Sequence, residues 1–209
     1  WHYRVSISVA AASSKKNTVV VDADFAALLA QLGISGTFDA SSPRVTRADV
    51  DALYAYLRTV KPVRNAVVVN HLRFPFNQRW SMGAWRELYF TEGTYRSDAT
   101  KSAAWNRGAY LVEGLGHCSD CHSPRNLLGG IEKSKAFTGA AIDGWFALNL
   151  SSNLHTGLGG WTAEDIATYL KTGAFKGRTT ALGPMAEVVR NSTRYLTDDD
   201  LKAIGEYIK

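Results

Sequence analysis

The sequence predicts a mainly α-helical chain with one candidate β-hairpin near its start. Apolar residues recur at helical spacing over residues 46–57, 162–172 and 197–208, each time behind a Thr that can cap the helix. Alternation typical of strands is limited to residues 3–10 and 18–21, and none appears in the second half of the chain. Hydrophobic residues make up 45% of the 209 residues, which is sufficient for a packed core.

Residues 1–60 are expected to form one small module. A polar turn joins the two strand-like segments, and a helix over residues 23–32 ends at Gly33. The next helix begins after Thr46, with Asp49 in its acidic first turn. One face of this helix is predicted to be buried, and it consists of Val50, Leu53, Tyr54 and Leu57.

Residues 61–100 form an aromatic-rich connector. Pro62 and Pro75 interrupt the helical pattern, and a short helix is predicted over residues 81–91. Trp80 and Trp85 are expected to fill the core.

Residues 101–209 are predicted to be an all-helical module with long loops. Its first helix starts near Lys101 and ends at Gly114 or Gly116. Thr162 and Asp165 form a capping box for a helix that Gly173 stops, and residues 174–196 are expected to be loop. Three Asp residues follow Thr197 at the positive end of the last helix.

The residues Cys118-Ser119-Asp120-Cys121-His122 form the C-x-x-C-H pattern typical of covalent haem c attachment. Cysteines three positions apart lie on one side of a helical turn, and each can add to one vinyl group of the porphyrin. The adjacent His122 then lies under the iron as an axial ligand. A zinc site would need further Cys or His nearby, and the chain has no other Cys. A redox dithiol and a chance match are the remaining alternatives, although no βαβ unit surrounds the motif.

The iron's second axial ligand is predicted to be Met185. It lies in a loop just before the final helix, and Pro184 stiffens that loop. Met82 precedes the motif in an aromatic stretch where a flexible side chain fills gaps, and His155 is the alternative for bis-histidine ligation.

Further residues are candidates for cofactor contacts. An axial His donates its outer N–H to a carbonyl, which the turn beginning at Pro124 or a distant segment could supply. Hydrogen bonds to haem propionates are predicted for Arg125, Trp145 and Asn149 in the loop-rich stretch of residues 123–160.

The charge and the haem motif together indicate function and compartment. The net charge of +5 is too diffuse for a nucleic-acid surface but can steer a redox partner. Covalent haem attachment indicates the periplasm. The sequence has no apolar run of 18 residues that would span a membrane. The sequence shows no signal peptide and begins with Trp1 in place of Met, which indicates a processed or trimmed start.

Several longer motifs resemble the last haem module of multihaem cytochrome c subunits of bacterial periplasmic dehydrogenases, including alcohol and gluconate dehydrogenases and molybdenum hydroxylases. The motifs are RGAYLVEGLGHCSDCHSPRN, GW-x-A-x-NL, GLGGWT-x-EDI and GPMAEVV-x-x-ST-x-YLT-x-x-DL, with RADVDALYAYLRTVKPV and FPFNQRWSMGAWRELYF upstream. The resemblance implies a class I cytochrome c fold over residues 101–209. It also implies haem c bound through Cys118 and Cys121, with His122 and Met185 as axial ligands.

The first module departs from that family, because residues 1–46 contain no Cys. Either this module has lost its haem or the chain lacks its beginning. Residues 1–60 are interpreted as a degenerate, haem-free cytochrome-like module that serves packing and docking. Two thioether bonds need two cysteines, so one haem per chain is expected.

The leading functional hypothesis is a non-catalytic electron-transfer subunit, because His/Met ligation leaves no open iron site. Its donor would be a catalytic dehydrogenase subunit, and its acceptor a cytochrome, an oxidase or a quinone-linked protein, with peripheral membrane association through the partner. The alternative is a stand-alone haem enzyme or ligand sensor of the peroxidase-like kind, which requires an iron without a firmly bound Met185. A pure docking module would leave the haem motif unexplained.

Overall fold

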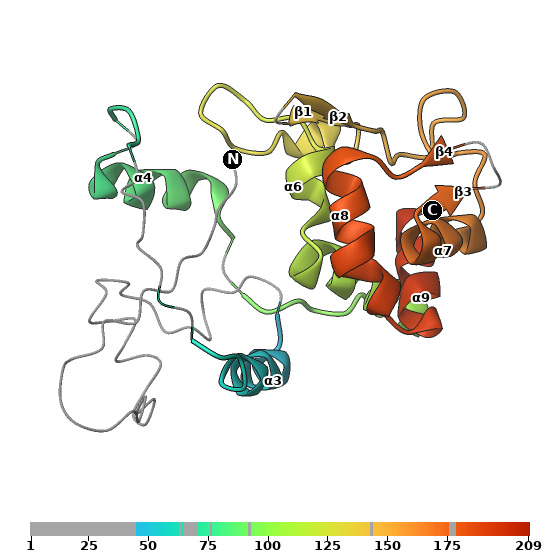
Figure 1. Ribbon diagram of the computed structural model, residues 1–209. Helices are drawn as coiled ribbons and strands as arrows, with labels where there is room; N and C mark the ends of the chain where they lie inside the picture. The colour runs from blue at the N-terminus through green and yellow to red at the C-terminus, as the bar shows by residue number, and fades with distance from the viewer. Residues whose placement is uncertain are drawn as a thin grey trace. The chain divides into compact units, whose positions relative to one another are not determined.

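The computed structural model describes residues 45–62, 64, 71–75, 77–91, 93–142, 144–175 and 179–209 (Figure 1). The chain divides into two compact units, Trp1–Thr94 and Tyr95–Lys209. The described residues are mainly helical, which confirms the predicted fold class at that level. The predicted strands and the helix at residues 23–32 lie outside them, and the module boundaries after residues 60 and 100 stay predictions. No helix in the described ranges is long and apolar enough to cross a membrane.

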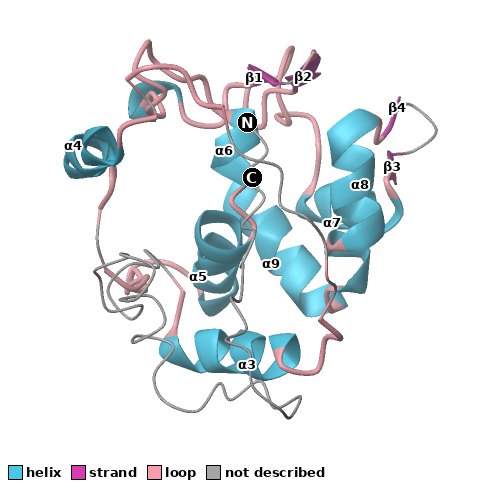
Figure 2. Cartoon of the chain, turned by 60° about the vertical axis from the view of Figure 1, so that its left-hand side comes forward, coloured by secondary structure: helices cyan, strands magenta, loops and turns pink. Residues whose placement is uncertain are grey.

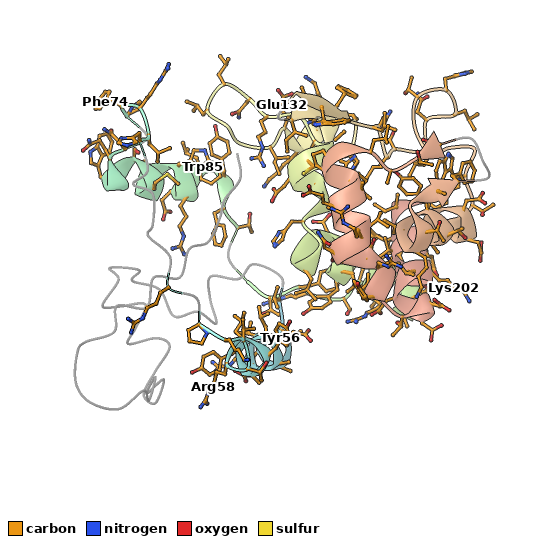
Figure 3. The ribbon with its side chains drawn as sticks, viewed as in Figure 1. Tyr56, Arg58, Phe74, Trp85, Glu132 and Lys202 are labelled. Carbon is orange, nitrogen blue, oxygen red and sulfur yellow. The ribbon has the colours of Figure 1, made fainter. Side chains whose placement is uncertain are left out.

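The first helix in the described part of unit 1 is α3, Arg47–Leu57. Its predicted cap is confirmed, because the backbone N–H of Asp49 donates to Thr46 Oγ1 over 3.2 Å. The predicted buried stripe is wrong: Leu53 is 53% exposed, Leu57 is 46% exposed, and no residue of the helix is buried. Tyr56 also extends into solvent from the same helix (Figure 3). Periodicity identifies the apolar face of a helix, but it does not say that another element covers that face.

The next described helix is α4, Arg79–Tyr89, which confirms the predicted short helix and places its start two residues earlier. The core-filling prediction is wrong for Trp80, whose surface is 69% exposed. Trp85, labelled on α4 in Figure 3, is partly buried. Its ring centroid lies 5.2 Å from that of Tyr89.

Three helices form the framework of unit 2. They are α5 (Ala103–Tyr110), which continues as a π-helical segment over Leu111–Leu115, α7 (Ala163–Thr172) and α9 (Asp198–Ile208). Helix α9 packs against both α5 and α7 (Figure 2). The buried cluster at this junction consists of Leu111, Val112 and Ile204.

The α5–α9 crossing is held by close backbone approach and by polar contacts at its ends. A Cβ on Gly108 would collide with the carbonyl oxygen of Ala203, so the two backbones touch there. Arg107 makes a bidentate ion pair with Asp200, with N···O distances of 2.7 and 3.0 Å. The Tyr207 hydroxyl donates to Glu113 over 2.6 Å.

The predicted caps of α7 and α9 are confirmed. In the capping box, Thr162 N–H donates to the Asp165 carboxylate over 2.9 Å, and Asp165 N–H donates to Thr162 Oγ1 over 3.1 Å. Helix α7 ends at Gly173. The N–H of Asp200 donates to Thr197 Oγ1 over 3.2 Å.

Two predictions for the second half are wrong. Residues 174–196 contain helix α8, Gly183–Asn191, and a 3₁₀ turn, Thr193–Tyr195. Pro184 lies in the first turn of α8. Backbone N–H groups there have no partner within the helix, so proline, which has no N–H, costs no hydrogen bond. Short antiparallel strand pairs also occur: β1 (Ala140–Ile142) with β2 (Trp145–Ala147), and β3 (Ala174–Phe175) with β4 (Thr179–Thr180).

The side chain of Asn106 on α5 holds the start of unit 2 through four hydrogen bonds. Its Oδ1 accepts hydrogen bonds from the Tyr95 hydroxyl over 2.8 Å and from Asp98 N–H over 2.7 Å. Its Nδ2 donates to the carbonyls of Asp98 and Ser102 over 2.8 and 3.0 Å.

We predict that Asn106→Ala lowers the free energy of unfolding by about 1–2 kcal/mol, because several partly solvated hydrogen bonds are lost together. Guanidinium unfolding of the haem-loaded chain measures this. Asn191→Ala, at the exposed end of α8, is the control and should change stability by less than about 0.5 kcal/mol. Equal effects of the two substitutions would contradict the fastening role.

Candidate haem-binding site

The candidate site is built on helix α6, Cys118–His122. It follows His117, whose φ of 47° turns the chain between the π-helical segment and α6. Neither Cys118 nor Cys121 is in a disulfide. Burial raises the pKa of the Cys118 thiol to about 11, so this thiol is neutral at neutral pH.

The ring of His122 is oriented by a backbone carbonyl. Its Nδ1 lies 2.7 Å from the Leu148 carbonyl oxygen. A carbonyl can only accept, so Nδ1 carries the proton and the lone pair of Nε2 is left for a metal. Burial lowers the pKa of His122, which favours the neutral imidazole that binds iron.

The orienting carbonyl belongs to Leu148, 26 positions along the chain, and not to the turn at Pro124. The Pro124 carbonyl instead accepts from Glu132 N–H over 2.9 Å. Of the two sources that the sequence left open, the distant one is found. Sequence reasoning missed Leu148 because every residue type has a backbone carbonyl, so the identity of the residue does not indicate this role.

A backbone clamp holds His122 against the segment that contains Leu148. The N–H of Gly139 donates to the His122 carbonyl over 2.8 Å. A Cβ on Gly139 would lie 2.8 Å from the Ala147 carbonyl oxygen and 3.1 Å from the nitrogen of Asn149. The φ of Gly139 is also positive, at 93°. Only glycine allows the three segments to meet here without strain.

A second layer of hydrogen bonds extends this clamp. Ser123, which is 1% exposed, accepts through Oγ from Phe137 N–H over 2.9 Å. The Phe137 carbonyl accepts from Leu150 N–H over 2.8 Å. The residues after the motif are thus tied to the residues after β2 through a buried hydroxyl, as expected of groups that fix a metal ligand.

Met185 lies in the first turn of α8 and is partly buried, so the loop predicted around it is helical. Just before it, Gly183 has a φ of 51°, and a Cβ there would lie 2.5–2.8 Å from carbons of the Trp145 indole. Trp145 is therefore packed on the backbone that leads into Met185. Met82 is exposed on α4 in the other unit. His155 is exposed in a turn, where its backbone N–H donates to Asn153 Oδ1 over 2.8 Å.

Two candidate propionate donors are engaged in local bonds. Arg125 donates to the Gly129 carbonyl over 2.9 Å and lies 3.3 Å from the Asp120 carboxylate. The Asn149 amide donates to Thr156 Oγ1 over 3.0 Å and accepts from Ser151 N–H over 2.8 Å. Their roles toward propionates stay predictions.

The residues present fit a covalently held haem. Two thiols and a neutral imidazole with a directed Nε2 lie on one short helix. Large apolar side chains are exposed in the segments around α6 and α8, as expected where an apolar ligand binds: Leu115, Trp145, Leu148 and Leu182. Among the described residues, no three His, Cys, Asp or Glu side chains gather as a separate metal site. This donor set is the one that defines c-type cytochromes.

Known proteins resemble this chain over most of its length. The fructose dehydrogenase cytochrome subunit of Gluconobacter japonicus is 42% identical over 182 residues, covering 86% of this chain and 37% of that protein. The cytochrome c subunit of the quinone-type alcohol dehydrogenase of Gluconobacter oxydans is 38% identical over 177 residues, covering 79% and 36% respectively. A diheme cytochrome c-type protein of Cereibacter sphaeroides is 38% identical over 174 residues, covering 81% and 56%. No family model matches the chain.

The chain therefore spans less than two thirds of the length of each of these relatives. A gluconate 2-dehydrogenase cytochrome c subunit and a nicotinate dehydrogenase subunit are also similar to it. The resemblance stated from the motifs is confirmed: over most of its length this chain is similar to proteins named as cytochrome c subunits of bacterial dehydrogenases.

We predict that Gly139→Ala is more damaging than Gly129→Ala, although both residues have positive φ (93° and 81°). Backbone strain alone should cost about 1–2 kcal/mol in either variant. Gly139→Ala adds a clash with the Ala147 carbonyl, worth about 1–3 kcal/mol more, whereas nothing lies within 4 Å of a Cβ on Gly129. Guanidinium unfolding of both haem-loaded variants is the measurement, and equal losses of stability would contradict the clamp.

Proposed function

We propose that this chain is an electron-transfer cytochrome c subunit that carries electrons from a periplasmic dehydrogenase to a downstream acceptor. One covalent haem c, bound by Cys118 and Cys121, would be ligated by His122 and Met185. The observation that carries the proposal is the hydrogen bond from His122 Nδ1 to the Leu148 carbonyl, which leaves Nε2 for the iron on the same helix as both thiols.

The protein's part in this function is to hold the ligands still. The Leu148 carbonyl fixes the tautomer of His122 and increases the basicity of its ring. The Met185 thioether, as the second proposed ligand, would raise the reduction potential and leave no open position for a substrate. A haem bound here supplies a one-electron iron couple. The chain contains two cysteines in total, which supports one covalent haem.

The relatives support the proposed partner. Several are named cytochrome subunits of dehydrogenases, so the proposed donor is a catalytic dehydrogenase subunit. The proposed acceptor is a cytochrome, an oxidase or a quinone-linked protein, and the proposed compartment is the periplasm. Residues 1–60 and 61–100 are proposed as the haem-free module and the connector, with residues 101–209 as the haem domain.

We predict that Met185→Ala abolishes the weak near-infrared thioether-to-iron band of the oxidised protein and lowers its reduction potential. Loss of the thioether removes the ligand that favours ferrous iron. Met82→Ala is the matched control, because it removes the chain's other methionine. If Met82→Ala removes the band and Met185→Ala does not, the assignment of the axial ligand is wrong.

We predict that the purified haem protein shows no turnover of alcohols, aldehydes or N-heterocycles by itself. It should be reduced by a dehydrogenase subunit and reoxidised by an acceptor, since a six-coordinate iron binds no substrate. Stopped-flow absorbance of the haem follows both half-reactions. Steady oxidation of such a substrate by the isolated chain would favour the stand-alone enzyme instead.

A further inference from the structure

The β1–β2 hairpin touches the segments that carry both candidate axial ligands. Directly after β2, the Leu148 carbonyl accepts the hydrogen bond from His122. Within β2, the Trp145 indole packs on Gly183, two residues before Met185. The two ligands lie on separate helices, α6 and α8, and a stretch of four residues, 145–148, reaches both.

The hairpin's register assigns different roles to its two neighbouring aromatic residues. Trp145 is opposite Ile142, and Phe146 is opposite Ala141. Successive side chains of a strand point to opposite faces. The face with Trp145 meets the start of α8, and Phe146 points away from that contact with 64% of its surface exposed.

The contact with Gly183 is tight enough to set the position of the start of α8. Carbons of the indole occupy the space that a side chain at residue 183 would take. Gly183 has no side chain that could adjust, and its φ of 51° is a conformation that favours glycine. A shift of the Trp145 ring would therefore displace the backbone of the first turn of α8. Met185 has a flexible side chain, so the backbone that presents it determines how often its sulfur is in place to bind.

We propose that Trp145 is a positioning residue for Met185, and that the β1–β2 hairpin couples the two axial ligands through rigid contacts on either side of a single strand. The proposal rests on the proposed function, since it requires Met185 to ligate the iron. The proposed effect is steric: the bulk of the Trp145 ring against Gly183 fixes the start of α8. A hydrogen bond from the indole N–H to a propionate is the competing role for the same residue.

Imidazole titration of the oxidised, haem-loaded chain tests this. Imidazole competes with the thioether, so its apparent Kd falls when Met185 is bound for a smaller fraction of the time. Trp145→Ala should lower that Kd by about tenfold, in line with the roughly 1.4 kcal/mol that loss of aromatic packing removes. The near-infrared band should weaken in parallel. Trp145→Phe keeps a smaller ring without the N–H and should lower the imidazole Kd by less than Trp145→Ala does.

Phe146→Ala is the matched control, because it removes an aromatic ring from the same strand on the other face. It should leave the imidazole Kd and the near-infrared band unchanged. If Trp145→Ala binds no haem, Trp145→Leu takes its place, since it removes the indole from Gly183 and keeps an apolar side chain. Trp145→Leu should likewise lower the imidazole Kd.

The outcomes separate this proposal from the assignment of Met185. Unchanged imidazole affinity in Trp145→Ala, with the band lost in Met185→Ala, overturns the positioning role alone. A band that survives Met185→Ala overturns the proposed ligation itself. If Trp145→Phe weakens the thioether bond as much as Trp145→Ala does, the N–H is what matters, and the steric role is overturned.

Discussion

The hydrogen bond between the His122 ring and the Leu148 carbonyl is the contact on which the site depends. The two residues are 26 positions apart, so the intervening chain must return to α6 and place the Leu148 carbonyl beside the His122 ring. Gly139 makes that return by bonding the His122 carbonyl while lying against residues 147–149. The buried Ser123 hydroxyl adds a further link to Phe137. These backbone contacts hold an imidazole in one tautomer and one orientation, which is what a permanent iron ligand requires.

The rest of unit 2 keeps α6 and α8 in place around this contact. Helix α9 packs on both α5 and α7, and the buried cluster of Leu111, Val112 and Ile204 lies beside the segment that leads into the haem motif. Helix α8 also contacts α7, so the two helices that carry the proposed iron ligands join one framework. A rigid framework suits electron transfer, because ligands that are already in place need little rearrangement when the iron changes its charge.

Much of this architecture could be predicted because it follows local rules. The caps at Thr46, Thr162 and Thr197 come from side chains three residues away from their partners, and such spacings are visible in a sequence. Helix α8 was missed because its Gly-Pro start resembles a loop, although proline in a first turn is itself a helix signal. The exposure of Leu53, Leu57 and Trp80 could not be predicted, because burial depends on neighbours distant in sequence. The Leu148 carbonyl lay beyond sequence reasoning for the same reason.

Every role proposed for unit 2 requires that α6 bind one haem through two thioether bonds. Mass spectrometry of the tryptic peptide from Gly108 to Arg125 measures this attachment, because the peptide contains both cysteines and His122. We expect a peptide that carries one complete haem and in which neither cysteine can be alkylated. A peptide of unmodified mass with two alkylatable cysteines, or with a Cys118–Cys121 disulfide, would contradict covalent haem binding.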